Sequence, residues 1–117
     1  MPNDLHVAQS EICRIFTHPA RIQILEILGE GERSVSDLAD LTGLPQPTVS
    51  QHLSILRQAG VVDTRRAGTT IHYRIADTRI LKACHVMRSV VLERLERMGE
   101  RARKGKAVSG GKTRRKS

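Results

Sequence analysis

The feature that most constrains this chain is a pair of short helical segments in its middle, joined by a turn. The first starts at Ser34 or Ser36, either of which can cap a helix, and stops at Gly43. The second runs from the Pro45–Pro47 segment to about Gln58. Its apolar residues recur at i, i+4 and i+7, which places them on one inner face: Val49, Leu53 and Leu56. Two short helices joined by a glycine-containing turn form a helix-turn-helix.

Two more helices are predicted before this pair. Residues 5–17 carry apolar side chains at helical spacing, and His18-Pro19 then interrupts the pattern. Proline is favoured at the first position of a helix, so His18 is expected to cap a second helix that ends at the glycines of residues 29–31. The inner face of the short third helix is expected to consist of Val35, Leu38, Ala39 and Leu41.

A hairpin and a long helix are predicted to follow. Residues 61–66 and 69–75 are expected to be strands, because apolar and polar residues alternate in the second of them. Asp77 caps a last helix that continues to about Arg101. Its apolar stripe predicts a partner helix, and therefore a dimer: Ile80, Cys84, Met87, Val91, Leu95 and Met98. The fold class is mainly α with a two-stranded wing, in the order α-α-α-α-β-β-α.

Length and composition favour one small domain. Of 117 residues, 38% are hydrophobic but only 2% aromatic, so Leu, Ile and Val must build the core. We expect the domain to cover residues 1–102 and a disordered basic tail to cover residues 103–117. No run is long enough to cross a membrane, and the first residues lack the features of a signal peptide, so a cytoplasmic location is expected. In that compartment, two cysteines are more often thiols than a disulfide.

The net charge of +8 is unevenly distributed. Residues 1–44 hold three basic and seven acidic side chains, whereas residues 45–92 hold seven basic and two acidic ones. Residues 103–117 add seven basic side chains and no acidic one. This asymmetry fits a polyanionic partner such as DNA, and the alternative is a solvated surface with a solubilising tail. An enzyme is not expected, because Cys-x-x-Cys, a glycine-rich phosphate loop and a Ser/His/Asp set are all missing from the sequence.

Three stretches resemble the arsenic-repressor (ArsR/SmtB) family of winged helix-turn-helix regulators: residues 18–28, 35–62 and 65–75. The run Thr48–Leu53, followed by Leu56 and Ala59–Val62, matches that family's recognition helix and turn almost residue for residue. The resemblance covers roughly residues 10–98. It implies a homodimer formed through the first and last helices. It also implies a transcriptional repressor that binds an inverted-repeat operator in double-stranded DNA and leaves it when an inducer binds.

A helix in the major groove reads base edges with polar side chains near its N-terminus. By resemblance, Gln46, Pro47, Ser50 and Gln51 occupy the groove-facing positions, although Pro47 can offer only apolar contact. On the wing, the arginines are expected to contact phosphate, and the alternative is a solvated edge that discourages aggregation. The full set of expected DNA contacts is Gln46, Pro47, Thr48, Ser50, Gln51, Ser54, Arg57, Arg65, Arg66, Thr70 and His72. His52 is expected to be structural or to contact phosphate.

The family's known metal sites are incomplete in this sequence. Ser34 and Ser36 stand where arsenic-sensing members carry a Cys-x-Cys. Asp77 stands at the first ligand position of the zinc and nickel sensors, but Arg79 and Val90 replace their histidines. No metal site and no cofactor are therefore expected.

Two cysteines remain as candidate sensors of an inducer. Cys13 and Cys84 fall on the first and last helices, which the resemblance places at the dimer interface. They could sense an oxidant, reactive sulfur or a soft metal ion, and the alternative is that both are small buried apolar residues. A regulator of the same fold that binds DNA constitutively, without any inducer, is the other hypothesis.

Overall fold

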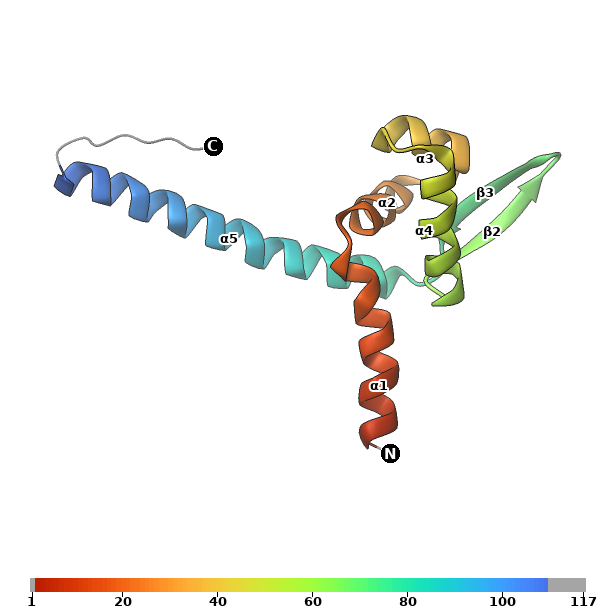
Figure 1. The fold of residues 1–117 in the computed structure, drawn as a ribbon, viewed down its shortest axis with the longest axis horizontal. Coiled ribbons are helices and arrows are strands. Elements are labelled where there is room, and N and C mark those ends of the chain that lie inside the picture. Colours follow the sequence, from red (N-terminus) through yellow and green to blue (C-terminus); the bar gives the residue numbers. More distant parts are fainter. Residues whose placement is uncertain (1, 110–117) are drawn as a thin grey trace. The chain divides into compact units, whose positions relative to one another are not determined.

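The computed structural model describes the backbone of residues 2–109 and the side chains of residues 4–103. The chain divides into two units, Met1–Cys84 and His85–Ser117. Figure 1 shows the order of the elements along the chain. They are α1 (Pro2–Cys13), a 3-10 turn (Arg14–Thr17), α2 (Pro19–Glu30), β1 (Arg33–Ser34), α3 (Val35–Thr42), α4 (Gln46–Gln58), β2 (Val62–Ala67), β3 (Thr70–Ile75) and α5 (Thr78–Ser109).

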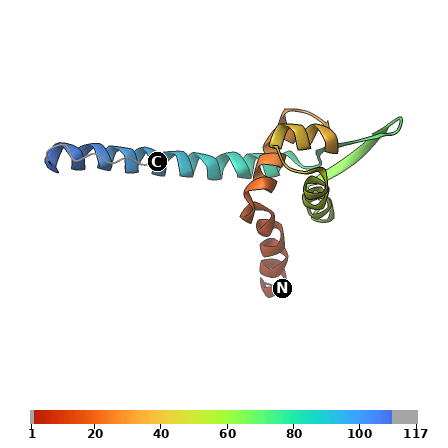
Figure 2. The same ribbon diagram turned by 45° about the horizontal axis from the view of Figure 1, so that its top comes forward.

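The winged helix-turn-helix fold predicted from the sequence is confirmed, with one addition to the sheet. β2 and β3 form the antiparallel wing, which extends away from α2, α3 and α4 (Figure 2). The two residues of β1 pair with the other edge of β3, so the sheet has three strands in the order β1-β3-β2 instead of the expected two. Two residues are too few to show an alternating pattern in a sequence.

The predicted helix caps are present. The His18 side chain accepts a hydrogen bond from the backbone N–H of Ala20, 3.3 Å away, at the start of α2. Of the two candidate serines, Ser34 caps α3. Its hydroxyl accepts from the Asp37 N–H, and the Asp37 carboxylate accepts from the Ser34 N–H, which makes a capping box. Gly43 ends α3 in the left-handed conformation, with φ of 76°.

α2 ends at Glu30, within the expected residues 29–31, and Gly31 follows it as the C-cap. A Cβ at Gly29 would lie 3.0 Å from a methyl carbon of Leu81, so glycine permits close packing there. Two local expectations were wrong. Leu41, expected on the inner face of α3, is 54% exposed. α5 reaches Ser109 instead of ending near Arg101, so helix extends into the segment expected to be a disordered tail. Residues 110–117 of that segment lie outside the described residues.

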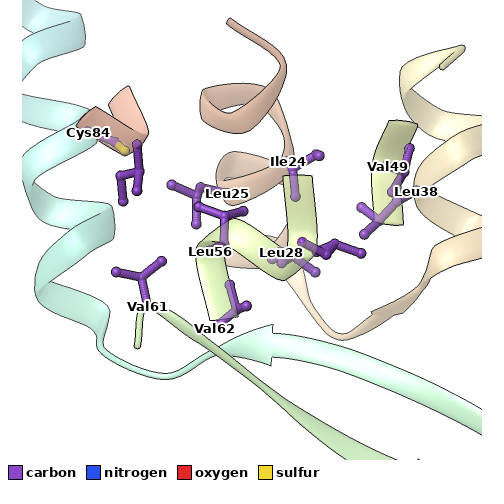
Figure 3. Packing of buried hydrophobic residues seen from close by; sticks show 11 residues of the cluster. Ile24, Leu25, Leu28, Leu38, Val49, Leu56, Val61, Val62 and Cys84 are labelled. Carbon is purple, nitrogen blue, oxygen red and sulfur yellow. The ribbon is translucent and has the colours of Figure 1, made fainter. Parts of the chain in front are cut away.

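The core of the first unit is aliphatic, as the composition predicted. Ile24, Leu25 and Leu28 of α2 pack against buried residues of the other elements (Figure 3). These are Ile15, Leu38, Val49, Leu53, Leu56, Val61, Val62 and Cys84. Phe16 and Tyr73 are only partly buried at its edge. This packing fixes α3, α4 and the base of the wing on α2, which is what positions the candidate site.

The apolar stripe of α5 continues into the second unit, where the described part of this chain leaves it uncovered. Ile80 packs against the core and Cys84 is buried in it. Farther along, the large apolar side chains are between 43% and 64% exposed: Val86, Met87, Val90, Val91, Leu92, Leu95 and Met98. No described helix is long and apolar enough to span a bilayer.

Candidate nucleic-acid interface

The inner and outer faces of α4 have different chemistry. Val49, Leu53 and Leu56 are completely buried, so they hold the helix on the core. The residues expected to contact DNA lie on the other side: Gln46, Pro47, Ser50, Gln51, Ser54 and Arg57 are exposed, and Thr48 is half-buried. A surface of short polar side chains near the N-terminus of a helix matches what a major groove accepts. The core therefore leaves free the face that the sequence predicted.

His52 belongs to the inner face of α4. It is 7% exposed, and its ring lies edge-on to the ring of His18, with 4.5 Å between the centroids. Its Nδ1 atom is buried without a hydrogen-bond partner in the structure. Burial lowers the pKa of His52, and the nearby charges of His18 and Arg21 lower it further. Of the two roles expected for His52, its burial fits the structural one.

The wing presents two faces, because side chains alternate along a strand. Asp63 and Arg65 of β2 lie opposite Arg74 and His72 of β3 on the outer face. The other face carries buried Val62 and the partly buried Tyr73 and Ile75, so it packs on the helices. Arg66, opposite Ile71, lies on this second face near the tip. Adjacent arginines that the sequence treated as a pair therefore point to opposite sides of the sheet.

The outer face of the wing holds an ionic network around Glu32, in the loop before β1. Arg65 donates from Nε and Nη2 to Oε1 of Glu32, at 3.0 and 2.7 Å. Nη1 of Arg74 lies 3.7 Å from Oε2 of Glu32, while its Nε donates to Asp63 at 2.6 Å. The hydrogen bond from Arg65 is the main reason why the pKa of Glu32 is lowered.

Arg66 differs from its neighbour. It is exposed and makes no hydrogen bond or ion pair with any described residue. Of the other expected wing contacts, Thr70 is exposed beside the turn and His72 is half-buried opposite Arg65 and Ser34. The sequence reasoning missed Glu32 altogether, because an acidic residue in a loop gives no periodic signal.

The comparisons with known proteins agree with this geometry. The profile of the family described as bacterial regulatory protein, arsR family, matches residues 18–64. The HTH-type transcriptional repressor SmtB of Mycobacterium tuberculosis is 40% identical over 101 residues, which are 86% of this chain and 70% of SmtB. This chain belongs to the ArsR family. The family consists of regulatory proteins and not enzymes, as the sequence predicted.

Solved structures place this ArsR-family chain among winged-helix domains. The homodimeric winged helix-turn-helix DNA-binding domain Mb0332 from Mycobacterium bovis is 32% identical, with a TM-score of 0.75. The match covers 82% of this chain and 89% of that one. NolR from Sinorhizobium fredii is 30% identical, with a TM-score of 0.72, and the match covers 76% and 89% of the two chains.

Two positions that the family resemblance marks as possible metal ligands have other roles in this chain. Ser34 caps α3. Asp77 accepts from the backbone N–H of Arg79 at 3.0 Å, which caps α5, and from Nη2 of the same residue at 2.6 Å. These bonds lower the pKa of Asp77 to about 2. Among the described residues, no three His, Cys, Asp or Glu side chains come together to hold a metal ion.

The two cysteines lie in different surroundings. Both are free thiols. Cys13 is exposed, in a shallow hollow at the end of α1 that His6, Ser10 and Arg14 also line. Cys84 is buried in the core, where burial and the nearby Glu26 raise the pKa of its thiol. Burial and a raised pKa leave little reactive thiolate at Cys84, which is therefore the protected thiol. Cys13 is accessible because it is exposed.

Proposed function

We propose that this ArsR-family chain is a transcriptional repressor that binds an inverted-repeat operator as a homodimer. The observation that carries the proposal is the exposed polar face of α4, held on a fully buried apolar face beside the wing. Each protomer inserts α4 into a major groove, where Gln46, Ser50 and Gln51 read base edges and Arg57 reaches phosphate. Two relatives support this assignment, since SmtB is named a repressor and Mb0332 is described as a homodimeric DNA-binding domain.

The operator proposal is tested by selecting DNA from a random duplex pool with the purified chain. We expect the recovered sequences to share an inverted repeat whose half-sites lie one helical turn apart, about 34–36 Å, and to be bound by two copies of the chain. Sequences without a shared motif, or one copy per site, would contradict the proposal.

The dimer is tested on α5. Its exposed apolar stripe needs a cover, and a second copy supplies one of matching chemistry. Leu95→Glu would place an unpaired carboxylate in that contact, so we expect a monomer in sedimentation and a loss of operator affinity on the order of a hundredfold. Ser89→Glu is the matched control, because residue 89 lies two positions from Val91 and so on the opposite side of the helix. If the Leu95→Glu variant still sediments as a dimer, the dimer interface does not include this part of α5.

We also propose that release from DNA is triggered at the thiols. The replaced metal positions and the exposure of Cys13 support this. A peroxide would oxidise the Cys13 thiol to a sulfenic acid and would itself be reduced to water. A second thiol would then condense with the sulfenic acid to form a disulfide and release another water. Cys84 would react more slowly, since the core must open to expose it.

The test of the thiols is release of operator DNA by hydrogen peroxide, by a persulfide donor and by soft metal ions. We expect Cys13→Ser to abolish the response and Cys84→Ser to reduce it. If both variants respond as the wild type does, the thiols are not the sensors and the inducer acts elsewhere. If the wild type never responds, the chain binds DNA constitutively, which is the alternative function.

A further inference from the structure

We propose that the two adjacent arginines of the wing have separate tasks. Arg65 is a positioning residue that, through Glu32, ties the hairpin to the body of the domain, and Arg66 is the wing's contact to DNA phosphate. The proposal rests on the proposed DNA-binding function and refines it, because charge alone would make the two arginines equivalent.

The first argument is the direction of the side chains. Arg65 lies on the outer face of the sheet, with Asp63, His72 and Arg74. Arg66 lies on the same face of the sheet as Val62, Tyr73 and Ile75. These three side chains pack in or against the core cluster that includes Leu53 and Leu56 of α4, so this face is turned toward α4. If α4 lies in the major groove, the Arg66 side chain therefore points toward the flanking phosphates, whereas the Arg65 side chain points away from them.

The second argument is the way in which Glu32 is shared. Its Oε1 accepts two hydrogen bonds from Arg65 on β2, and its Oε2 faces Arg74 on β3 at 3.7 Å. One carboxylate thus links the loop before β1 to both long strands of the wing. A two-stranded hairpin is marginal by itself, so such links decide the angle at which it leaves the domain.

The third argument is the balance of charge. The carboxylates of Glu32 and Asp63 offset the guanidinium groups of Arg65 and Arg74, and the network is neutral. Arg66 is the remaining arginine of the hairpin, and it has no partner among the described residues. Arg65 would have to give up its two hydrogen bonds to Glu32 before it could bind a phosphate, whereas Arg66 could bind one without losing any hydrogen bond.

The salt dependence of binding separates the two tasks. Affinity for the selected operator is measured over a range of NaCl concentrations. We expect Arg66→Ala to lower the slope of log K against log salt by about 0.9 per protomer, roughly two for a dimer, and to weaken operator and random DNA equally. Arg65→Ala and Glu32→Gln should leave the slope unchanged and weaken operator binding about two- to fivefold, the size expected of an exposed ion pair.

A charge exchange tests the positioning role without relying on truncation. Arg65→Glu alone places two carboxylates together and should weaken binding. Adding Glu32→Lys restores opposite charges between positions 32 and 65 but places a second cation near Arg74, so the double variant should recover part of the operator affinity that the single variant loses. If Arg65 itself contacts phosphate, the double variant stays as weak as the single one, and the proposal is wrong.

Two other results would contradict the separate tasks of Arg65 and Arg66. A lower slope in Arg65→Ala, or a steeper one in Glu32→Gln, would overturn the division of tasks, the second because Glu32 would then be withholding Arg65 from DNA. Hydrogen exchange of the free protein checks the anchor without DNA: Glu32→Gln should speed exchange in β2 and β3 and leave α4 unchanged. If the wild type shows no salt-dependent binding to any duplex, the proposed function itself fails, and this inference with it.

Discussion

At the scale of single residues, α4 has a buried side that packs on the core and an exposed side that is available for DNA. Ser50 and Gln51 are exposed, whereas Val49 and His52 on either side of them are buried. We expect the double variant Ser50→Ala, Gln51→Ala to lose discrimination between operator and random DNA. The loss should be about 1–3 kcal/mol for each good hydrogen-bonded contact to a base that is removed. Competition binding measures this. Gln58→Ala, exposed at the end of the same helix, is the control, and unchanged sequence preference in the double variant would contradict this reading face.

His52 predicts a pH dependence of stability. Its pKa is lowered from 6.5 in the folded protein by burial first, then by His18 and Arg21. Below pH 6.5 the unfolded chain therefore binds the proton more readily. The free energy of unfolding should fall as the pH drops through this value, until the folded His52 is itself protonated. Denaturant titrations of His52→Phe should show a smaller loss between pH 7 and 5, roughly the range where histidine titrates. Exposed His85→Gln should keep the wild-type dependence, and an identical loss in both variants would exclude His52 as the cause.

At the scale of elements, those with a strong period or a defined cap were predictable from the sequence. α3 and α4 follow from their spaced apolar residues and from Ser34 and Gly43. β1 was not predictable, since two residues show no alternation and the strand exists only because β3 offers it an edge. α5 is longer than expected because a basic tail predicts disorder, although Lys, Arg and Ala are good helix formers.

The candidate site was predictable to a similar degree, for a physical reason. The outer face of α4 is the complement of a local apolar pattern, so the sequence contains it. The task of Arg65 is not local: it depends on Glu32, which is 33 residues away along the chain. Contacts of this kind are set by the packing of whole elements.

The capping box of α3 gives a prediction for one element. The Ser34 hydroxyl and the Asp37 carboxylate satisfy backbone N–H groups that the helix itself cannot pair. Ser34→Ala should lower the free energy of unfolding by about 1 kcal/mol, within the usual 0.5–2 kcal/mol for removal of a cap. Ser36→Ala is the matched control, because Ser36 is exposed and does not cap the helix. Equal destabilisation in the two variants would mean that the cap contributes little.

At the scale of the whole molecule, the surface proposed for assembly and the surface proposed for DNA belong to different elements. The exposed apolar residues lie on α5, where we propose the assembly contact, whereas the proposed DNA contacts are the exposed polar face of α4 and Arg66. Two copies joined through α5 would present two reading faces, and each face alone recognises only half of a site. The affinity of such a dimer depends on both α4 helices binding their half-sites at the same time. It is therefore sensitive to any change in the orientation of one protomer relative to the other.

The basic residues at positions 110–117 are expected to strengthen DNA binding without changing its specificity. Residues 110–117 contain four Lys or Arg and no Asp or Glu. Cations that neutralise phosphates add affinity through released counterions, and this contribution does not depend on base sequence. Deleting these residues should therefore lower the salt slope and weaken operator and random DNA by the same factor. Changing the four to Gln keeps the length and should reproduce the deletion, because the effect is one of charge. If either variant selects a different operator from the random pool, the segment contributes to specificity, and recognition is not confined to α4 and the wing.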